Sequence, residues 1–293
     1  NAAFGAQALA ANTNGAGNTA LGYRALASNT VGDNMTAVGF RALEQQQDAL
    51  RNTAMGSRAA QYTTTGGDNA AFGMHALRFN STGTQNTAVG SQSLDSSTGT
   101  SNTALGSSAL GGLGSGDGNI GIGSGGGGSL AIGSNNIYVG NAGQNFESGK
   151  IRIGTSSQTE TFITGISGNT ASGGIAVFVN ASHELGTATS SIRYKDEVRT
   201  LDDPTELLMQ LRPVSFVDRE DHGGDGRTVE YGLIAEEVAD VAPELVAFGE
   251  DGAPYSVRYH LLTPMLLAEL QRQQRTIAAQ AAAIAELREQ LGR

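Results

Sequence analysis

A five-residue element recurs through the first third of the chain and constrains its fold more than any other feature. Each copy starts with Asn, ends with Gly, and carries Ala and one large apolar residue between them. Consecutive copies are 17 residues apart, except for the last interval of 16. The copies begin at Asn1, Asn18, Met35, Asn52, Asn69, Asn86 and Asn102, with Met replacing Asn once. Such a period indicates a stack of similar coils, because one coil cannot bury its apolar residue alone.

Each part of the element predicts one part of a coil. The run Ala-apolar-Gly is too short for a helix, and we expect its large residue, such as Phe4 or Leu21, to point inward from a short strand. Gly permits a turn or a close approach of two backbones. Asn is typical of turns, and we expect it to form a ladder between stacked coils. A second apolar position, Leu in six copies and Ala in one, lies four residues after each Gly. The pattern therefore predicts a β-solenoid or β-roll, with a length on the order of 30 Å for these coils.

The apolar content of one coil is small, so we expect three chains to pack their rolls about a common axis. The N-x-A-ϕ-G element, in which ϕ is apolar, resembles the head repeats of trimeric autotransporter adhesins, which form left-handed parallel β-rolls as trimers. After Leu110 the register degrades, and the Gly-rich residues 111–134 suggest a tapering coil with flexible turns. Residues 136–189 predict further short strands in NIYVG, KIRIG, TFITGI and IAVFVN, which alternate apolar and polar residues.

Composition and charge exclude several classes of function. The chain has no Cys, which excludes a disulfide framework, thiolate catalysis and sulfur-ligated metal sites. Its net charge is −10, concentrated in residues 151–293, so it lacks the basic stripe that nucleic acid or an anionic membrane surface attracts. No apolar run of about 18 residues is present, so no membrane insertion is expected. The chain starts without Met and without a signal-peptide pattern, and we interpret it as a fragment.

Other constellations do not point to a cofactor or a metal. The four histidines, His75, His183, His222 and His260, show no metal-ligand spacing. The Gly-rich stretch lacks the Lys-Ser/Thr of a phosphate loop, and GGLGSGDG is a single imperfect copy of a calcium-binding nonapeptide. Glu236, Glu237 and Asp240 are interpreted as a solvated helix face. We therefore expect no cofactor and no metal.

From Ser190 the chain becomes acidic, poor in Gly and partly helical. Pro204 starts a predicted helix, residues 212–217 predict a strand, and Asp218–Arg227 predicts a charged hairpin loop. A second, amphipathic helix should end before Pro243, and a strand should lead into a final helix. That helix carries a heptad pattern over roughly residues 264–291, at Leu266, Leu270, Gln273, Ile277, Gln280, Ile284, Leu287 and Leu291. The pattern fits a short coiled coil, and a helix that packs on its own domain is the alternative.

Five sequence blocks in this half resemble one known family. They are SSIRYK (190–195), LRPVSF (211–216), YGLIAEEV (231–238), PELV (243–246) and VRYHLLTPMLLAEL (257–270). Residues 190–293 resemble the intramolecular chaperone auto-processing domain of phage tail fibres and tailspikes, the peptidase S74 or endosialidase-type C-terminal domain. The resemblance implies a domain that trimerises, templates folding of the fibre ahead of it and then cuts itself off.

The resemblance also implies the residues that cut. The nucleophile would be Ser190, the base Lys195 and the scissile bond Thr189–Ser190, with Arg193 also matching the motif. Ile192 and Ser191 depart from the family, where a basic residue and Asp are common. The chemistry is consistent with the residue types, because a Ser hydroxyl needs a neighbouring base and a desolvated Lys can act as one, whereas Arg cannot. Lys150 and Lys195 are the only lysines beside 16 arginines. Ser191 is the alternative nucleophile, and a solvated strand start is the alternative role for the motif.

The sequence therefore predicts a mainly β protein with an α+β C-terminal domain. Residues 1–135 should form the trimeric β-solenoid shaft, 136–189 a β connector, and 190–293 the chaperone domain that ends in the coiled coil. We expect a homotrimer, a virion tail fibre or a bacterial surface fibre, with a glycan or protein receptor. The self-cleaving serine endopeptidase would turn over once. The alternatives are a bacterial trimeric surface adhesin that is never cut and, disfavoured by its single interrupted Thr column, an ice-binding solenoid.

Overall fold

The structure is a computed structural model, and it describes residues 1–166, 170–180, 182–201, 204–222, 224–249 and 251–292. The chain forms two compact units, Asn1–Thr164 and Gly165–Arg293, which are described separately. The boundaries predicted at residues 135 and 189 therefore differ from the division of the chain into compact units.

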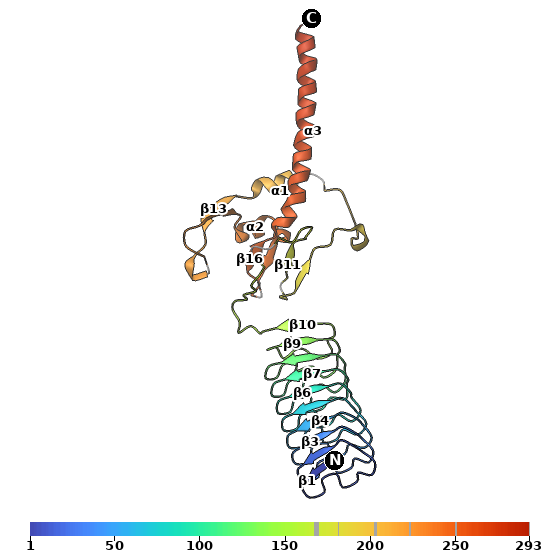
Figure 1. Cartoon of the computed structure of the whole chain (residues 1–293). Coiled ribbons are helices and arrows are strands. Elements are labelled where there is room, and N and C mark those ends of the chain that lie inside the picture. Colours follow the sequence, from blue (N-terminus) through green and yellow to red (C-terminus); the bar gives the residue numbers. More distant parts are fainter. Residues whose placement is uncertain (167–169, 181, 202–203, 223, 250, 293) are drawn as a thin grey trace. The chain divides into compact units, whose positions relative to one another are not determined.

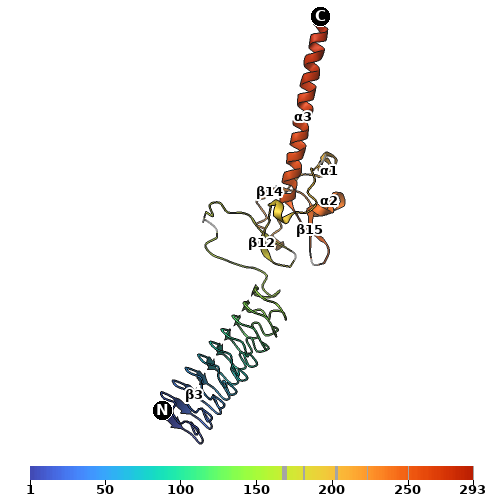
Figure 2. The same ribbon diagram turned by 90° about the vertical axis from the view of Figure 1, so that its right-hand side faces the viewer.

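The first unit is a β-solenoid in which every coil contributes one strand of three residues (Figures 1 and 2). The ten strands pair in chain order into one parallel sheet, and equivalent residues of successive coils lie opposite each other. The strands are β1 (Ala2–Phe4), β2 (Thr19–Leu21), β3 (Thr36–Val38), β4 (Thr53–Met55), β5 (Ala70–Phe72), β6 (Thr87–Val89), β7 (Thr103–Leu105), β8 (Ile120–Ile122), β9 (Ile137–Val139) and β10 (Ile151–Ile153). The predicted solenoid is confirmed.

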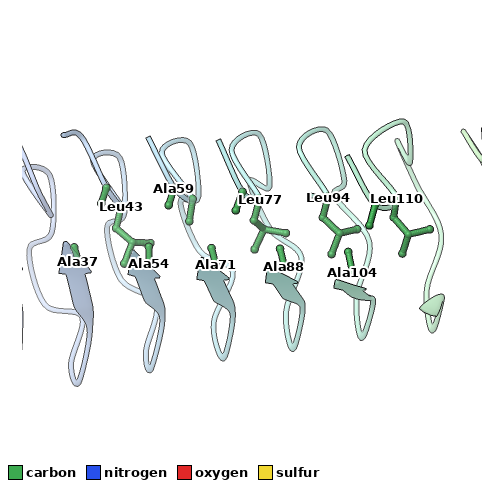
Figure 3. Close-up of a cluster of buried hydrophobic side chains, with 14 of the residues drawn as sticks. Ala37, Leu43, Ala54, Ala59, Ala71, Leu77, Ala88, Leu94, Ala104 and Leu110 are labelled. Atoms are coloured by element: carbon green, nitrogen blue, oxygen red, sulfur yellow. The ribbon is translucent and has the colours of Figure 1, made fainter. Parts of the chain in front are cut away.

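The large apolar residue at the end of each strand points outward, so the prediction that it faces the core is wrong. Phe4, Leu21 and Leu105 are 77, 44 and 49% exposed, whereas the middle alanines from Ala20 to Ala104 are buried. Side chains alternate along a strand, so in a three-residue strand only the middle one can face inward when the two ends face outward. Figure 3 shows the row of middle alanines facing a row that includes Leu43, Leu77, Leu94 and Leu110.

The predicted Asn ladder is confirmed and links the coils through side-chain amides. Asn86 is representative: its Oδ1 accepts from the backbone N–H of Asn102 at 2.9 Å, and its Nδ2 donates to the Gly99 carbonyl at 2.8 Å. Both bonds are buried. The ladder satisfies backbone groups at the turns that the parallel strands do not reach.

The Gly at the end of each element is required because the coils approach each other closely there. Gly39 has a φ of +132°, and a Cβ at this position would lie 2.5 Å from the carbonyl oxygen of Gly56 in the next coil. A side chain would therefore separate the coils. Of the two roles that the sequence allows for this Gly, a turn or a close backbone approach, the structure shows the close approach.

The repeat does not degrade after Leu110, contrary to the sequence-based prediction. Asn119 and Asn136 continue the Asn ladder, and β8, β9 and β10 extend the parallel sheet beyond residue 135. The Gly-rich run provides space for Tyr138, which replaces the middle Ala and is fully buried. A Cβ at Gly127 would lie 2.7 Å from the Tyr138 ring. The glycines therefore fit a large core residue and do not mark a loosening coil.

An ionic network closes the last coils around Tyr138. The Tyr138 hydroxyl donates to Glu147 Oε1 at 2.9 Å, and Arg152 forms an ion pair with Glu147 at 2.7 Å. Burial raises the pKa of the Tyr138 hydroxyl, and the Arg152 guanidinium lowers the pKa of the Glu147 carboxyl.

The strand predicted in TFITGI, residues 161–166, is wrong. No strand forms there, because these residues lie beyond the last coil and have no partner strand.

In its described residues, the second unit is a small mixed domain built from hairpins and three α-helices. The antiparallel hairpins are β11 (Val177–Val179) with β12 (Leu185–Thr187), β13 (Val214–Val217) with β14 (Val229–Gly232), and β15 (Val246–Phe248) with β16 (Pro254–Val257). The α-helices are α1 (Thr205–Gln210), α2 (Ala235–Val241) and α3 (Tyr259–Leu291), and the 3-10 turns are η1 (Ile192–Tyr194), η2 (Glu220–His222) and η3 (Pro243–Leu245). These elements confirm the predicted helix start at Pro204, the strand in 212–217, the following hairpin and the second helix. In the predicted loop, Gly223 lies outside the described residues.

The core of this domain is small and surrounds α2. Its buried residues are Val238, Ala242, Leu245, Val246, Val257 and Leu262. The first turns of α3 join this core through Leu262 and are linked to α1 by a hydrogen bond from Thr205 to Glu269. From Gln273 to Leu291 every residue of α3 is exposed. The alternative in which the heptad packs on its own domain therefore holds only for the start of the helix.

Candidate functional site

The predicted cleavage point, Thr189–Ser190, lies between two ordered elements of the second unit. The hairpin β11–β12 ends at Thr187, and η1 starts at Ile192. This hairpin packs against the start of α3, where the rings of Phe178 and His260 have centroids 4.7 Å apart. This ring contact places Phe178, in the hairpin before the scissile bond, beside the first residues of α3, while the other strand residues of the hairpin are exposed.

Ser191 has a structural role that sequence reasoning did not identify. It is the N-cap of η1, and its Oγ accepts hydrogen bonds from the backbone N–H of Arg193 at 3.4 Å and from Arg193 Nε at 3.2 Å. The Arg193 guanidinium also lies over the Tyr194 ring, 5.5 Å from its centroid. A Ser that precedes a short turn with Arg two residues later is the sequence signal for this arrangement. These contacts direct Arg193 to Ser191 and Tyr194 and make Ser191 a weaker candidate for the nucleophile.

Ser190 and Lys195 flank the same 3-10 turn. Lys195 is its C-cap, and its backbone N–H donates to the Ile192 carbonyl at 3.2 Å. Both residues are exposed, and across the described part of the chain neither Ser190 Oγ nor Lys195 Nζ has a hydrogen-bond partner. Ile192 and Tyr194 between them are 68 and 65% exposed. In a single chain, Ser190 and Lys195 are therefore both exposed to water, whereas a lysine that acts as a base must be desolvated.

An open apolar groove lies beside the start of α3. It has a volume of about 460 Å³ and is lined by Pro213, Val214, Ser215, Tyr231, Gly232, Leu233, Tyr259 and Leu262. The Leu233 backbone N–H donates to the Tyr259 hydroxyl at 2.8 Å, and a Cβ at Gly232 would lie 2.6 Å from that hydroxyl. The lining holds no carboxylate, histidine or lysine, so the groove is suited to packing rather than to acid–base chemistry.

Two long apolar surfaces remain uncovered in the single chain. The first, here called the strand face, consists of the outward residues of the solenoid strands. Its large members include Leu21, Met55, Phe72, Leu105 and Ile122, which are 44, 44, 37, 49 and 37% exposed. The second, called the α3 seam, consists of the heptad positions Leu266, Leu270, Gln273, Ile277, Gln280, Ile284, Leu287 and Leu291. Exposed apolar surfaces of this extent are typical of protein–protein interfaces.

The other candidate residues do not form a site. Glu237 forms an ion pair with Arg212, and this hydrogen-bonded guanidinium lowers the pKa of the Glu237 carboxyl. Among the described residues, no group of three or more His, Asp or Glu side chains is arranged to hold a metal ion. None of the helices in the described ranges is both long enough and apolar enough to cross a membrane.

Comparison with known proteins places a family match on the segment that begins at Ser190, directly after the predicted cleavage point. The family model of peptidase S74, described as chaperone of endosialidase, matches residues 190–247. Its first matched residue is Ser190, and the match ends within β15 (Val246–Phe248). No curated protein and no solved structure matched the chain. The match confirms the resemblance for this segment, and the solenoid ahead of it is consistent with the repeats.

Proposed function

We propose that the chain is the shaft and C-terminal chaperone of a homotrimeric fibre, and that the chaperone domain releases itself by autoproteolysis at Thr189–Ser190. The observation that carries the proposal is the combination of a chaperone-of-endosialidase segment starting at Ser190 with a β-solenoid ahead of it. A virion tail fibre or a bacterial surface fibre is the setting that such a combination fits.

Trimerisation is supported by the position of the apolar residues in the solenoid. In the coils up to residue 110 the core consists mainly of alanines and one leucine or alanine per coil, while larger apolar side chains such as Leu21, Met55 and Phe72 lie on the strand face. Burying these side chains against two other chains would stabilise a solenoid whose own core is thin. The outward Leu, Met and Phe therefore become the contact surface of the trimer.

The α3 seam supports the same assembly in the second unit. Ile277 and Ile284 occupy a positions and are 58 and 51% exposed in the single chain. A parallel bundle of three α3 helices would cover them and place the shafts of three chains next to one another. Raising the effective concentration of the solenoids in this way is the chaperone role, because their coils specify register among chains only weakly.

The proposed cleavage needs only Thr189, Ser190, Lys195 and water. In the trimer, covering Ile192 and Tyr194 would remove water from Lys195. Lys195 then takes the proton of the Ser190 hydroxyl, and Ser190 Oγ attacks the Thr189 carbonyl carbon. Lys195 gives this proton to Ser190 N as the bond between Thr189 C and Ser190 N breaks, which leaves an ester between Thr189 and Ser190 Oγ. Water then hydrolyses the ester and restores the Ser190 hydroxyl. The products are a Thr189 carboxylate and a free Ser190 amine.

A trimeric surface fibre that is never cut is the second candidate. It is favoured by the exposure of both Ser190 and Lys195 and by the placement of the two residues at opposite ends of η1. In that case the domain from residue 190 onward trimerises and remains attached.

Intact mass and N-terminal sequencing of the purified chain separate the two candidates. Autoproteolysis gives two pieces, residues 1–189 and 190–293, and the smaller one starts at Ser190. Ser190→Ala and Lys195→Arg should both stay whole, since the first removes the nucleophile and the second keeps the charge but loses the base. Ser191→Ala is the matched control and should still be cut. A small piece that starts elsewhere, or equal cutting of Lys195→Arg, would overturn the mechanism.

A further inference from the structure

One patch of the solenoid surface carries large charged and aromatic side chains that the fold does not require. Backbone bonds from Arg41 N to the Tyr23 carbonyl (2.9 Å) and from Arg58 N to the Phe40 carbonyl (2.7 Å) show that these residues stack in successive coils. The same bond joins Ser108 N to the Ser91 carbonyl at 2.8 Å in a later coil. Serine satisfies the backbone geometry equally well, so arginine and aromatic residues serve another purpose in the early coils.

The patch combines two stacked aromatic pairs with the arginines beside them, and His75 Nδ1 lies 3.5 Å from Arg78 Nη1. We call it the Arg–aromatic patch, which consists of Tyr23, Arg24, Phe40, Arg41, Arg58, Tyr62, His75, Arg78 and Phe79. Tyr23 stacks on Phe40 with ring centroids 5.6 Å apart, and Tyr62 stacks on Phe79 at 5.1 Å. Arg58 lies 5.7 Å from the Phe40 centroid. Arg78 lies 4.2 Å from the Phe79 centroid. The rings thus limit the freedom of the guanidinium groups before any ligand arrives.

The patch has an excess of positive charge in an acidic protein. Arg24 and Arg41 lie 2.9 and 3.7 Å from the buried Glu44, and Arg78 pairs with Asp95 at 2.9 Å. Arg58 has no carboxylate partner in residues 1–164, all of which the structure describes. Four arginines therefore face two carboxylates, although the chain as a whole has a net charge of −10. Local charge of this sign attracts an anionic ligand that the rest of the surface repels.

The strand face, rather than this patch, is suited to the contact between chains. Its outward side chains are apolar or Thr, so covering them leaves no charge unpaired. Covering the patch would bury Arg58 without a counter-charge, which is costly. The Arg–aromatic patch therefore stays accessible in the trimer.

The stacking of the aromatic rings within the patch favours an acidic polysaccharide over a single-stranded nucleic acid as the ligand. Single-stranded nucleic acids bind largely by stacking bases on open aromatic faces. Phe40 and Phe79 each already have a tyrosine ring and a guanidinium against them. What the patch offers is a row of guanidinium donors, which bind carboxylate and sulfate groups strongly. Widely spaced anionic groups also suit an acidic protein better than the dense charge of a duplex.

We propose that the Arg–aromatic patch binds an acidic polysaccharide through its guanidinium groups. The inference names the receptor class for the attachment role of the proposed fibre. Its four coils span about 14 Å at the strand spacing of a β-sheet, enough for a short anionic oligosaccharide lying along the coil stack. Binding does not depend on the cleavage at Thr189–Ser190, because the patch is complete within one chain.

The test measures binding of the full chain to immobilised heparin and to polygalacturonate, with neutral dextran and single-stranded DNA as comparison probes. Arg58→Gln removes the guanidinium without a carboxylate partner and should weaken binding about tenfold. Arg51→Gln is the matched control, since Arg51 pairs with Asp68 outside the patch. It should bind like the unchanged chain. Light scattering and intact mass of the same samples report assembly and cleavage independently of binding.

The proposal is supported if both acidic polysaccharides bind, if binding falls with added salt, and if it is weakened about tenfold by Arg58→Gln but kept by Arg51→Gln. Absence of binding to both polysaccharides by a folded chain would overturn it. Equal weakening by the two substitutions would mean that binding depends only on the net charge of the chain, and would also overturn the proposal. Tighter binding to single-stranded DNA would assign the patch to nucleic acid instead. If the chain is monomeric but binds as expected, the trimer proposal fails while the patch proposal stands.

Discussion

Replacing Ile277 and Ile284 together by Asp tests whether the α3 seam assembles the fibre. The two side chains are 58 and 51% exposed in one chain, so about half of each is available for burial between helices. Full burial of such a side chain contributes about 1.5–3 kcal/mol, so half of each gives about 1 kcal/mol. Two residues in each of three chains then give on the order of 6 kcal/mol per trimer, an upper value. This corresponds to about four orders of magnitude in the association constant.

The assay is size-exclusion chromatography with light scattering over a range of protein concentrations. Far-UV circular dichroism of the whole chain reports its β content. The unchanged chain should give three times the chain mass, and the double Asp variant should dissociate and yield less folded solenoid. Ala279→Asp with Ala282→Asp is the matched control, because it adds the same charge to the same helix away from the seam. Equal assembly of both double variants, or a monodisperse monomer from the unchanged chain, would refute the reasoning.

Two further predictions concern the stability of the solenoid. Asn86→Ala removes the acceptor of the Asn102 N–H and the donor to a buried carbonyl, and should lower the free energy of unfolding in urea by about 2–6 kcal/mol. Thr82→Ala, at an exposed position of the same coil outside the strand face, should change this free energy by less than about 0.5 kcal/mol, and equal effects would contradict the ladder's role. Arg152 lowers the pKa of Glu147 in the folded state. The Glu147–Arg152 ion pair therefore stabilises the folded chain above about pH 4.3, the value of an unperturbed Glu, and this stabilisation is lost as the pH falls below that. Hydrogen-exchange protection factors of the last coils, which correct for the intrinsic pH dependence of exchange, should therefore fall on acidification in the unchanged chain and fall less in Glu147→Gln. Identical pH profiles of the protection factors would exclude this carboxylate.

The regular part of the fold could be predicted because its physical cause is local and repeated. Asn, Gly and the apolar positions at 17-residue spacing specify a turn, a close approach and a short strand, and many copies leave stacking as the consistent solution. The hairpin after residue 212 and the helix before Pro243 were predictable for similar reasons, because strand alternation, turn residues and Pro act over short distances.

The direction of the strand side chains could not be predicted from the repeat alone. A three-residue strand has one inward and two outward positions, or the reverse, and both patterns place Ala and an apolar residue next to each other. The opposite turn decides between them, because its leucines already fill the interior and leave space only for Ala. The role of the Gly run was hidden for the same reason: Tyr138, which occupies the space beside Gly127, comes from the next coil.

The candidate site shows the same division. The sequence alone, through its resemblance to a family, predicted Ser190 and Lys195 as the residues for the proposed chemistry, and it identified the heptad of the last helix. Only the tertiary structure decided that Ser191 is engaged by Arg193, that Ser190 and Lys195 lie in water, and that α3 leaves its core after the first turns. Residue identity sets the available chemistry, whereas burial and side-chain direction arise from contacts between segments far apart in the chain.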